Sequence, residues 1–221
     1  IGTNTFSATQ IAQKDYGLAD IIPELNISSV ENAKAAIKKY NLKNPRECFI
    51  AGSIGPTNIT TSMSPNVEDP SYRVINFDQL SKNYYEQAKS LLTAGADLLI
   101  VETIFDTLNA KAAIYAIKNL EEEFDIEIPL MISVTITDAS GRTLSGQTVE
   151  AFWNSIRHAK PISVGINCAL GAAEMMPYLK KQTALLVATQ MLDCLTHFLK
   201  RDMMKLLKLR QNLLKYLLKI I

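Results

Sequence analysis

The sequence predicts an α/β fold built around a parallel β-sheet. Short apolar segments of strand length alternate about five times with longer segments of helical periodicity, and the joins between them are short. The apolar segments are continuous runs, which is typical of parallel strands buried on both faces. The 221 residues, 48% hydrophobic and 20% charged, are enough for one globular domain with its own core.

The first part of the chain predicts the end of one strand, two helices and a second strand. Residues 1–6 have the pattern of a strand end, and residues 7–16 predict a short helix that Ser7 caps and the next glycine ends. Residues 29–40 predict a longer helix, because apolar residues recur there every three to four positions. Residues 48–52 predict a short strand. The long polar loop that follows is of a kind that is usually functional or disordered.

The rest of the chain continues the alternation of helices and strands. We expect helices at 77–94, 106–124, 148–158 and 172–181, and strands at 97–102, 129–136 and 162–166. This order argues for parallel βαβ units joined by right-handed crossovers. A barrel of eight such units takes about 250 residues. We therefore predict a (β/α)8 TIM barrel with pieces missing, and an open doubly wound sheet as the alternative.

Composition narrows the class of protein. The three cysteines, Cys48, Cys168 and Cys194, are too widely and unevenly spaced for a disulfide framework, and no charged-then-apolar leader opens the chain. A reducing, cytoplasmic location is the expectation. No apolar run approaches the roughly 20 residues that cross a bilayer. We expect neither a membrane nor a nucleic acid as partner.

The charge distribution divides the chain into two parts. Residues 1–187 contain 16 Lys and Arg against 20 Asp and Glu, whereas residues 188–221 contain 7 against 2. We expect the first part to be a partial barrel domain and the second a basic Leu/Lys-rich tail outside it. Taken literally, the tail is a basic amphipathic helix for a membrane surface or a partner groove. The chain also begins without Met, so we expect a partial sequence.

Candidate functional residues follow the predicted strands. In a barrel, the loops after the strands share one face, and the reacting groups gather there. The residues that we expect at this face are Asn4 and Thr5, Gly55 to Asn58, Glu102 and Thr103, Thr135 to Gln147, and Asn167 and Cys168. The stretch from Thr137 to Gln147 is either a polar crossover loop or a surface for a substrate or partner domain.

Two of these residues have competing interpretations. Glu102 either binds a ligand ammonium group or caps the helix that starts near residue 106. Cys168 is either an ordinary buried thiol or the ligand of a soft metal ion with one face open to substrate. Cys48, inside a predicted strand, is expected in the core. His158, at a helix end, is expected to be solvated.

Several motifs together resemble the homocysteine-binding domain of the cobalamin-dependent methionine synthases, from residue 3 to about residue 181. The matching runs are Thr3 to Phe6, Gly55 to Asn58, Glu102 to Ala113, Ser133 to Gln147, and Gly165 to Gly171. The wider family of homocysteine methyltransferases shares the shorter pieces. The runs Asp106 to Lys111 and Asp138 to Gln147 are specific to the cobalamin-dependent branch.

This resemblance implies a (β/α)8 barrel and a homocysteine S-methyltransferase activity. It implies a zinc ion that holds homocysteine sulfur as a thiolate, which attacks the methyl group of methylcobalamin on another domain. Cobalamin- and folate-binding domains of the parent enzyme are the implied partners. Cys168 matches the first of three cysteine ligands of zinc, and Glu102 matches the acid that holds the homocysteine amino group. Asn4 and Thr5 are implied at the substrate site.

The sequence also departs from the family pattern. The other two zinc ligands belong to a Gly-Gly-Cys-Cys-Gly segment, and no adjacent cysteine pair occurs in this sequence. The family's amino-terminal Asp-Gly strand is also missing. We therefore expect a barrel without its first strand and last units, inactive as written because zinc ligands are missing. The alternative is a non-catalytic remnant, or a partial barrel held by a partner through its basic tail.

A shifted reading frame would explain the tail. The family continues with Asn-Ala-Gly-Leu-Pro-Asn-Ala-Phe, whereas this chain has an unrelated run from Gln190 to Phe198. Codons CAA ATG CTG GAC TGC CTA ACG CAT TTT encode that run, and the family peptide appears when they are read from the third base. We hypothesise a one-base frameshift between about Lys181 and Gln190. Sequencing the coding DNA tests this, because an adjacent open frame must encode the family peptide. The pair Cys194 and His197 is then no zinc motif.

Overall fold

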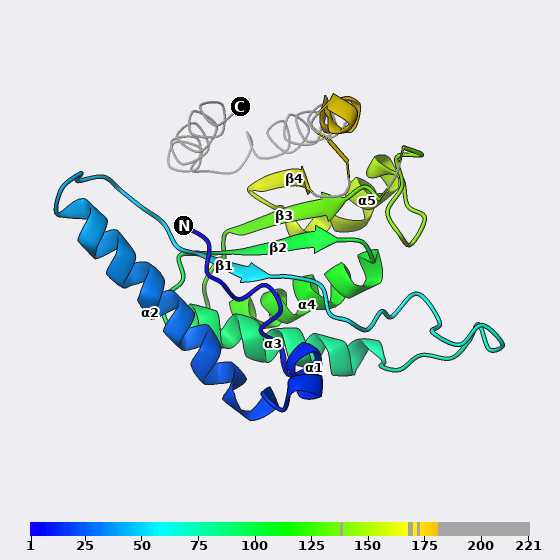
Figure 1. Ribbon diagram of the computed structural model, residues 1–221, viewed down its shortest axis with the longest axis horizontal. Coiled ribbons are helices and arrows are strands. Elements are labelled where there is room, and N and C mark those ends of the chain that lie inside the picture. Colours follow the sequence, from blue (N-terminus) through cyan, green and yellow to red (C-terminus); the bar gives the residue numbers. More distant parts are fainter. Residues whose placement is uncertain (138, 168–169, 172, 181–221) are drawn as a thin grey trace.

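The computed structural model describes residues 1–137, 139–167, 170–171 and 173–180. Within these residues, four parallel strands form one sheet in the order β1-β2-β3-β4 (Figure 1). The strands are β1 (Ala51–Ile54), β2 (Leu98–Ile104), β3 (Leu130–Thr135) and β4 (Ser163–Asn167). The amino-terminal segment lies along the free edge of β1 and joins it by a single parallel bridge between Gly2 and Ala51. The predicted strand end is therefore present as this one bridge.

Helices connect the strands and pack against one another in chain order. They are α1 (Gln10–Gln13), α2 (Ile22–Asn41), α3 (Phe77–Thr93), α4 (Thr107–Phe124) and α5 (Val149–Ile156), with 3-10 turns at Lys14–Tyr16, Ala19–Ile21 and Arg157–Ala159. Residues 173–180 are also helical. Helix α2 contacts α3, α3 contacts α4, and α4 contacts α5. Figure 1 shows α3 and α4 covering the same face of the sheet.

This arrangement confirms the predicted α/β fold with a parallel sheet. Each strand pairs with its neighbour in sequence, and the order does not reverse within the described sheet. A doubly wound sheet reverses its strand order at a switch point, whereas a barrel wall continues in one direction. The four strands therefore have the order expected of a barrel wall.

The core lies between the sheet and the helices. Side chains that alternate along the strands point toward α3 and α4 and are buried, as shown by Ile54, Leu99, Val101, Ile132 and Val134. Gly52 belongs to the same face, where an added Cβ would come within 2.8 Å of Leu99 Cδ2. The same Cβ would lie 3.3 Å from Leu91 Cβ on α3, so a side chain at this position would force its neighbours to shift.

Two element boundaries differ from the prediction. Helix α2 begins at Ile22 instead of residue 29, because a proline occupies its first turn, where a missing N–H costs nothing. Strand β1 begins at Ala51 instead of residue 48, because its pairing with β2 begins at Ala51. Cys48 therefore precedes the strand and is half-buried, so its predicted place in the core is wrong.

The other helices start and end close to the predicted positions for identifiable reasons. Asn76 and Gln79 form a reciprocal capping box at the start of α3. Helix α1 is capped by Thr9 and not by Ser7, and Gly17 ends the following 3-10 turn at φ 68°. His158 lies in the exposed turn after α5, as predicted.

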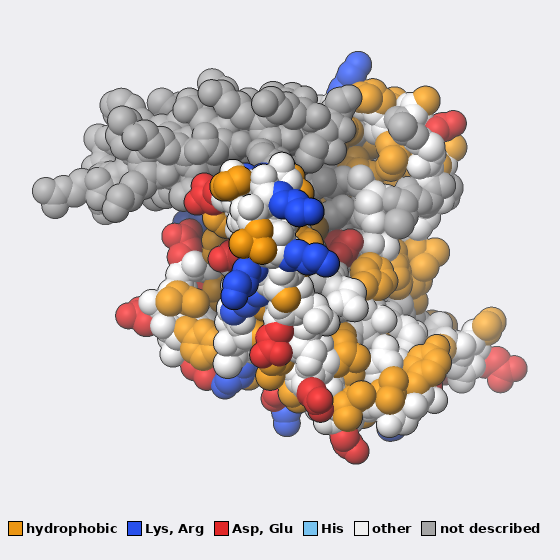
Figure 2. Space-filling view, turned by 60° about the vertical axis from the view of Figure 1, so that its left-hand side comes forward, with side chains coloured by type: hydrophobic (Ala, Val, Ile, Leu, Met, Phe, Trp, Pro, Cys, Tyr) orange, Lys and Arg blue, Asp and Glu red, His pale blue; other side chains and the backbone are white. Residues whose placement is uncertain are grey.

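Charged side chains of both signs lie on the surface of the described residues (Figure 2). On the face drawn in Figure 2, the described basic and acidic side chains are interspersed with apolar ones. None of the helices in the described ranges combines the length and the hydrophobicity of a membrane span.

Candidate functional site

Polar side chains gather on the face of the sheet opposite α3 and α4, which we call the inner face. Because side chains alternate along a strand, residues that share a register position across neighbouring strands point the same way. The polar residues of the inner face that hydrogen-bond to other side chains, near the carboxyl ends of the strands, are Ser53, Glu102, Thr103, Ser133 and Asn167. They come from all four strands and form two hydrogen-bonded groups.

The first group centres on the Glu102 carboxylate. Ser53 Oγ donates a hydrogen bond to Glu102 Oε1 at 2.5 Å. Ser53 N in turn donates to Thr3 Oγ1 at 2.9 Å, and Thr5 Oγ1 donates to the carbonyl oxygen of Ser53 at 2.7 Å. Glu102 is only half-buried. Its carboxylate is thus oriented by a buried serine and still has acceptor capacity for a ligand.

The structure separates the two predicted residues of the amino-terminal segment. Thr5 is completely buried, and its carbonyl oxygen also accepts a hydrogen bond of 2.7 Å from Gln87 Nε2 on α3. Asn4 is exposed. Thr5 therefore holds the backbone of Ser53 in place from within the protein interior. It has no exposed surface that could contact a ligand in this conformation. Thr3, which the sequence did not single out, belongs to the same group.

The second group is built on an irregularity in β2. Val101 pairs with Ile132 and Ile104 pairs with Val134, so Glu102 and Thr103 together lie opposite a single residue of β3. Thr103 has a backbone φ of 58°. A β-branched residue in this left-handed region costs about 1–3 kcal/mol and persists only where its surroundings enforce it. The strain lies directly beside the candidate ligand-binding acid.

Asn167, the last residue of β4, ties this bulge to the rest of the sheet. Its Nδ2 donates to Thr103 Oγ1 at 2.8 Å, and its Oδ1 accepts from Ser133 Oγ at 2.7 Å. The next residue is Cys168, the predicted metal ligand, which lies outside the described residues. Thr135 is paired with Asn167 in the sheet, and its buried hydroxyl has no hydrogen-bond partner among the described residues.

Sequence reasoning found Glu102 but missed this network. The signal that could have indicated it is the polar pair Glu102 and Thr103 followed by apolar Ile104. In a regular strand, Ile104 would share the face of Glu102, yet it is buried with the core. An extra residue in the strand resolves this conflict, and the sequence contains no other sign of it.

The long loop after β1 is ordered, and the buried amide of Asn109 on α4 anchors it. Asn109 Oδ1 accepts from Thr61 N at 2.9 Å and from Thr61 Oγ1 at 2.6 Å. Asn109 Nδ2 donates to the carbonyl oxygen of Ile59 at 2.9 Å and to Thr57 Oγ1 at 3.2 Å. All four hydrogen-bonding positions of this side chain are therefore used within the loop.

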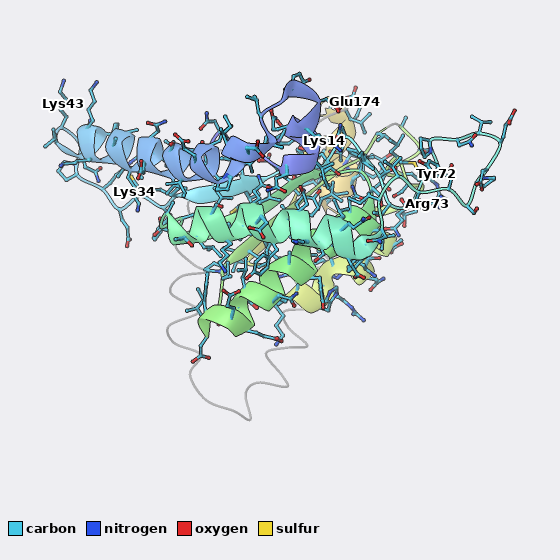
Figure 3. The ribbon with its side chains drawn as sticks, turned by 90° about the horizontal axis from the view of Figure 1, so that it is seen from below. Lys14, Lys34, Lys43, Tyr72, Arg73 and Glu174 are labelled. Atoms are coloured by element: carbon cyan, nitrogen blue, oxygen red, sulfur yellow. The ribbon has the colours of Figure 1, made fainter. Side chains whose placement is uncertain are left out.

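Two charged residues complete the anchoring of this loop. Asp106 caps α4 through Leu108 N at 2.9 Å and also accepts from Ser62 N at 3.1 Å. Arg73 donates to four backbone carbonyl groups of the loop, including that of Thr61 at 2.8 Å. Figure 3 shows Arg73 at the end of the molecule opposite Lys43, where the loop projects. Asp106 is thus the helix cap that Glu102 was considered to be.

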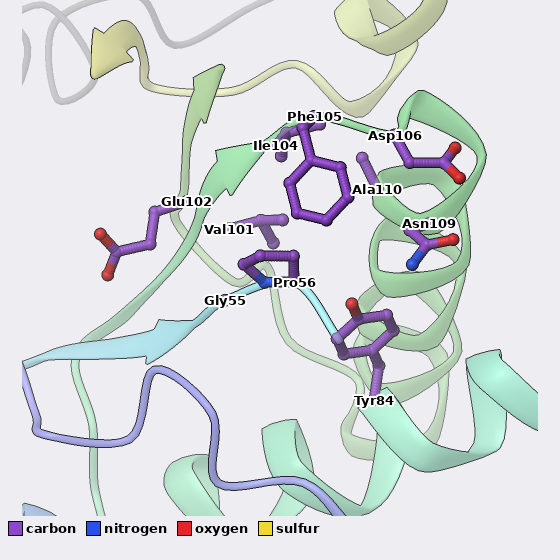
Figure 4. Close-up of a pocket in the computed structure, with 10 residues that line it drawn as sticks. All are labelled: Gly55, Pro56, Tyr84, Val101, Glu102, Ile104, Phe105, Asp106, Asn109 and Ala110. Atoms are coloured by element: carbon purple, nitrogen blue, oxygen red, sulfur yellow. The ribbon is translucent and has the colours of Figure 1, made fainter. Parts of the chain in front are cut away.

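A small cavity lies where the start of this loop meets β2, α3 and α4, and Glu102 is among the residues that line it. Its volume is about 10 Å³, room for one water molecule. Figure 4 shows Tyr84, Asp106 and Asn109 on one side of β2 and the Glu102 carboxylate on the other. Burial raises the pKa of Tyr84 well above its usual range. The cavity is therefore lined mainly by residues that anchor the loop, and it is too small for a ligand larger than water.

The polar segment after β3 is a compact turn that packs on the start of α4. Thr143 N donates to the carbonyl oxygen of Gln147 at 2.9 Å, and Gly146 adopts φ 88°. Thr107 Oγ1 donates to Gln147 Oε1 at 2.5 Å. The interpretation as a crossover loop accounts for these bonds. Asp138, within the predicted motif, lies outside the described residues.

The described residues do not form a metal centre. No group of three or more His, Cys, Asp or Glu side chains that could hold a metal ion occurs in this part of the chain. An open zinc site needs three protein ligands, which the described side chains do not supply.

Comparison with known proteins adds a family and a fold. A family model described as homocysteine S-methyltransferase matches residues 1–200. The homocysteine methyltransferase MmuM from Escherichia coli, in its metallated form, aligns at 24% identity and a TM-score of 0.59, over 76% of this chain and 57% of that one. The apo form aligns at 20% identity and a TM-score of 0.54, over 78% and 57%. The chain thus spans a little over half the length of these structures, and the likeness establishes the fold.

Proposed function

Because the chain belongs to the homocysteine S-methyltransferase family, we propose that residues 1–187 are the homocysteine-binding part of a methyltransferase in which homocysteine is the methyl acceptor. We further propose the cobalamin-dependent methionine synthase branch, with methylcobalamin and folate bound by other domains of the parent enzyme. The branch is supported by the runs from Asp106 to Lys111 and from Asp138 to Gln147. The tail from 188 to 221 is then no part of the native fold.

The position of Glu102 is the observation that carries this proposal. Its carboxylate lies on the inner face, at the carboxyl end of a parallel strand, where barrel enzymes bind their substrates. Ser53 fixes one of its oxygens, so that the carboxylate is oriented before a ligand arrives. A carboxylate accepts strong hydrogen bonds from an ammonium group, and homocysteine carries one.

The other proposed substrate residues act at different distances from the ligand. We assign Asn4, which is exposed beside β1, to a direct contact with homocysteine. Thr5 is buried and acts through Ser53, whose carbonyl oxygen it binds. The buried hydroxyl of Thr135 has no hydrogen-bond partner among the described residues. It is therefore a further hydrogen-bonding group for a ligand at the same end of the sheet.

The zinc that the family implies does not fit the described residues. Cys168 is our proposed zinc ligand, but the sequence has three cysteines at separate positions and no adjacent pair. One thiolate cannot replace three. We therefore propose that this polypeptide binds zinc weakly and does not turn over homocysteine. The same observation favours a second candidate, a non-catalytic remnant that retains the homocysteine-binding face.

Substitution of Glu102 tests the proposal. The full chain is titrated with L-homocysteine and with mercaptobutyrate, its analogue without the amino group, and binding is followed by NMR. We expect wild type to favour homocysteine and Glu102→Gln to bind it about 10- to 100-fold more weakly, because a charge-assisted hydrogen bond contributes about 1.5–3 kcal/mol. The affinity for mercaptobutyrate should not change.

Glu31→Gln on the exposed surface of α2 is the matched control and should bind both compounds like wild type. If wild type binds homocysteine and mercaptobutyrate equally, or if Glu102→Gln retains the preference, Glu102 does not hold the ammonium group. If wild type binds neither compound, the proposed function fails.

A further inference from the structure

The bulge in β2 places two successive polar side chains on one face of the sheet. In a regular strand, Glu102 and Thr103 would point to opposite faces. Here Glu102 bonds to Ser53 on β1, while Thr103 bonds to Asn167 on β4. Ile104 then returns to the core, where it is 4% exposed. The extra residue therefore allows the inner face to have two adjacent polar groups without losing a core side chain.

The conformation of Thr103 needs support from outside its own strand. Threonine has no local reason to adopt a φ of 58°, because its branched Cβ clashes there, whereas glycine would fit easily. The side-chain hydrogen bond from Asn167 Nδ2 is such a support. Asn167 is itself held by Ser133 Oγ on the strand between them. The strained turn is thus connected across β2, β3 and β4.

We propose that Thr103 and Asn167 are positioning residues for Glu102. Their hydrogen bond holds the left-handed turn, and the turn holds the Glu102 carboxylate on the inner face against Ser53, ready for the ammonium group of an amino acid ligand. The ligand class rests on the proposed function above; the positioning itself rests on the bulge. Asn167 also immediately precedes Cys168 in the sequence, so one side chain links the acid to the segment proposed to hold the ligand's sulfur.

Two variants of Thr103 distinguish the effect of its hydroxyl from the effect of its branched shape. Thr103→Val keeps the branched side chain and removes the hydroxyl, whereas Thr103→Ser keeps the hydroxyl. We expect Thr103→Val and Asn167→Ala each to reduce the preference for homocysteine over mercaptobutyrate about tenfold, and Thr103→Ser to restore it. Because both variants remove the same bond, the double variant should lose little more than either single one.

Thr93→Val, at the exposed end of α3, is the matched control and should keep the full preference. Urea unfolding of each variant accompanies the titrations. If Thr103→Val unfolds more easily but discriminates between the two ligands as well as wild type, the hydrogen bond only stabilises the fold and the proposal is overturned.

A second measurement needs no ligand and keeps this proposal distinct from the proposed function. Crystal structures of wild type, Thr103→Val and Thr103→Ser report the distance between Ser53 Oγ and the Glu102 carboxylate. We expect hydrogen-bond distance in wild type and Thr103→Ser and a displaced carboxylate in Thr103→Val. An unchanged carboxylate in Thr103→Val contradicts the positioning role, whether or not the chain binds homocysteine.

Discussion

Single side chains hold the loops of this protein in place, and Asn109 is the clearest example. It is 3% exposed and makes four hydrogen bonds to one loop. If the Asn109 amide is removed, each loop group that it binds loses a hydrogen bond, and water cannot replace that bond in the buried site. The loop after β1 therefore depends on one amide from a helix that lies about 50 residues further along the chain.

Asn109→Ala should lower the free energy of unfolding by about 3 kcal/mol, since it leaves several buried polar groups unpaired. Urea denaturation followed by circular dichroism measures this change. Asn154→Ala on the exposed side of α5 is the control and should change the stability by less than about 0.5 kcal/mol. Equal effects of the two substitutions would show that the loop anchor contributes no stability.

At the residue scale, the sequence predicts chemistry better than geometry. Glu102 was identified because an acid at the end of an apolar strand is unusual and its position is visible in the sequence. Thr103 and Asn167 were expected at the same face, but their hydrogen bond was not, and Ser53 was not identified. These roles depend on the register between strands that lie far apart in the chain. Register is a property of pairs of strands and is not encoded in any single segment.

Helices α3 and α4 are joined at the surface by a cluster of ionisable groups. Lys89 Nζ lies 2.7 Å from Glu123 Oε1, and the Tyr85 hydroxyl also donates to the Glu123 carboxylate. The hydrogen bond from Lys89, followed by that from Tyr85, lowers the pKa of Glu123 below its ordinary value of 4.5. The cluster thus stabilises the folded state while Glu123 is ionised.

The contribution of this cluster should vary with pH in a defined direction. A lowered folded pKa means that the stabilisation is complete above pH 4.5 and is lost as the pH falls through the lowered value. We expect the urea midpoint of Glu123→Gln to lie slightly below that of wild type at pH 7 and to converge with it on acidification. Glu122→Gln, exposed on the same helix, is the control. A difference that grows toward low pH would contradict this assignment.

At the element scale, the sequence predicted the starts of the capped helices α3 and α4 closely and the start of strand β1 less closely. Helix α4 begins next to Asp106 and α3 next to Asn76, because these residues cap their own helices through local hydrogen bonds. Strand β1 lies three residues further along than predicted because strands need partners. A strand boundary is therefore decided by segments elsewhere in the chain.

At the scale of the whole molecule, the prediction to test is metal binding. The full chain, purified with added zinc and then freed of excess by gel filtration, should retain much less than one zinc per chain, because its three cysteines are dispersed along the sequence. Elemental analysis measures the zinc content. Cys168→Ser should lower the remaining affinity further, whereas Cys48→Ser should not. One tightly bound zinc per chain, with thiolate absorbance when cobalt replaces it, would refute this expectation.

The overall architecture was predictable because alternation of strands and helices constrains topology strongly. Parallel strands joined by right-handed crossovers place successive helices on one face, as α3 and α4 show. The division of the chain at residues 187 and 188 stays a prediction, because the tail lies outside the described residues. Length and strand count alone do not distinguish the two faces of the sheet; the polar pairs across the strands mark the inner face as the candidate site.

The bulge in β2 also has a consequence for how the chain folds. Two flat apolar strands can pair in several registers that differ by one or two residues, and each slip is a possible misfolded state. With the bulge, a slip of β2 past Ser133 would move Ile104 onto the polar face and Thr103 among the apolar side chains of α4. The irregularity that interrupts the pairing of β2 and β3 therefore selects one alignment of these strands against the neighbouring ones.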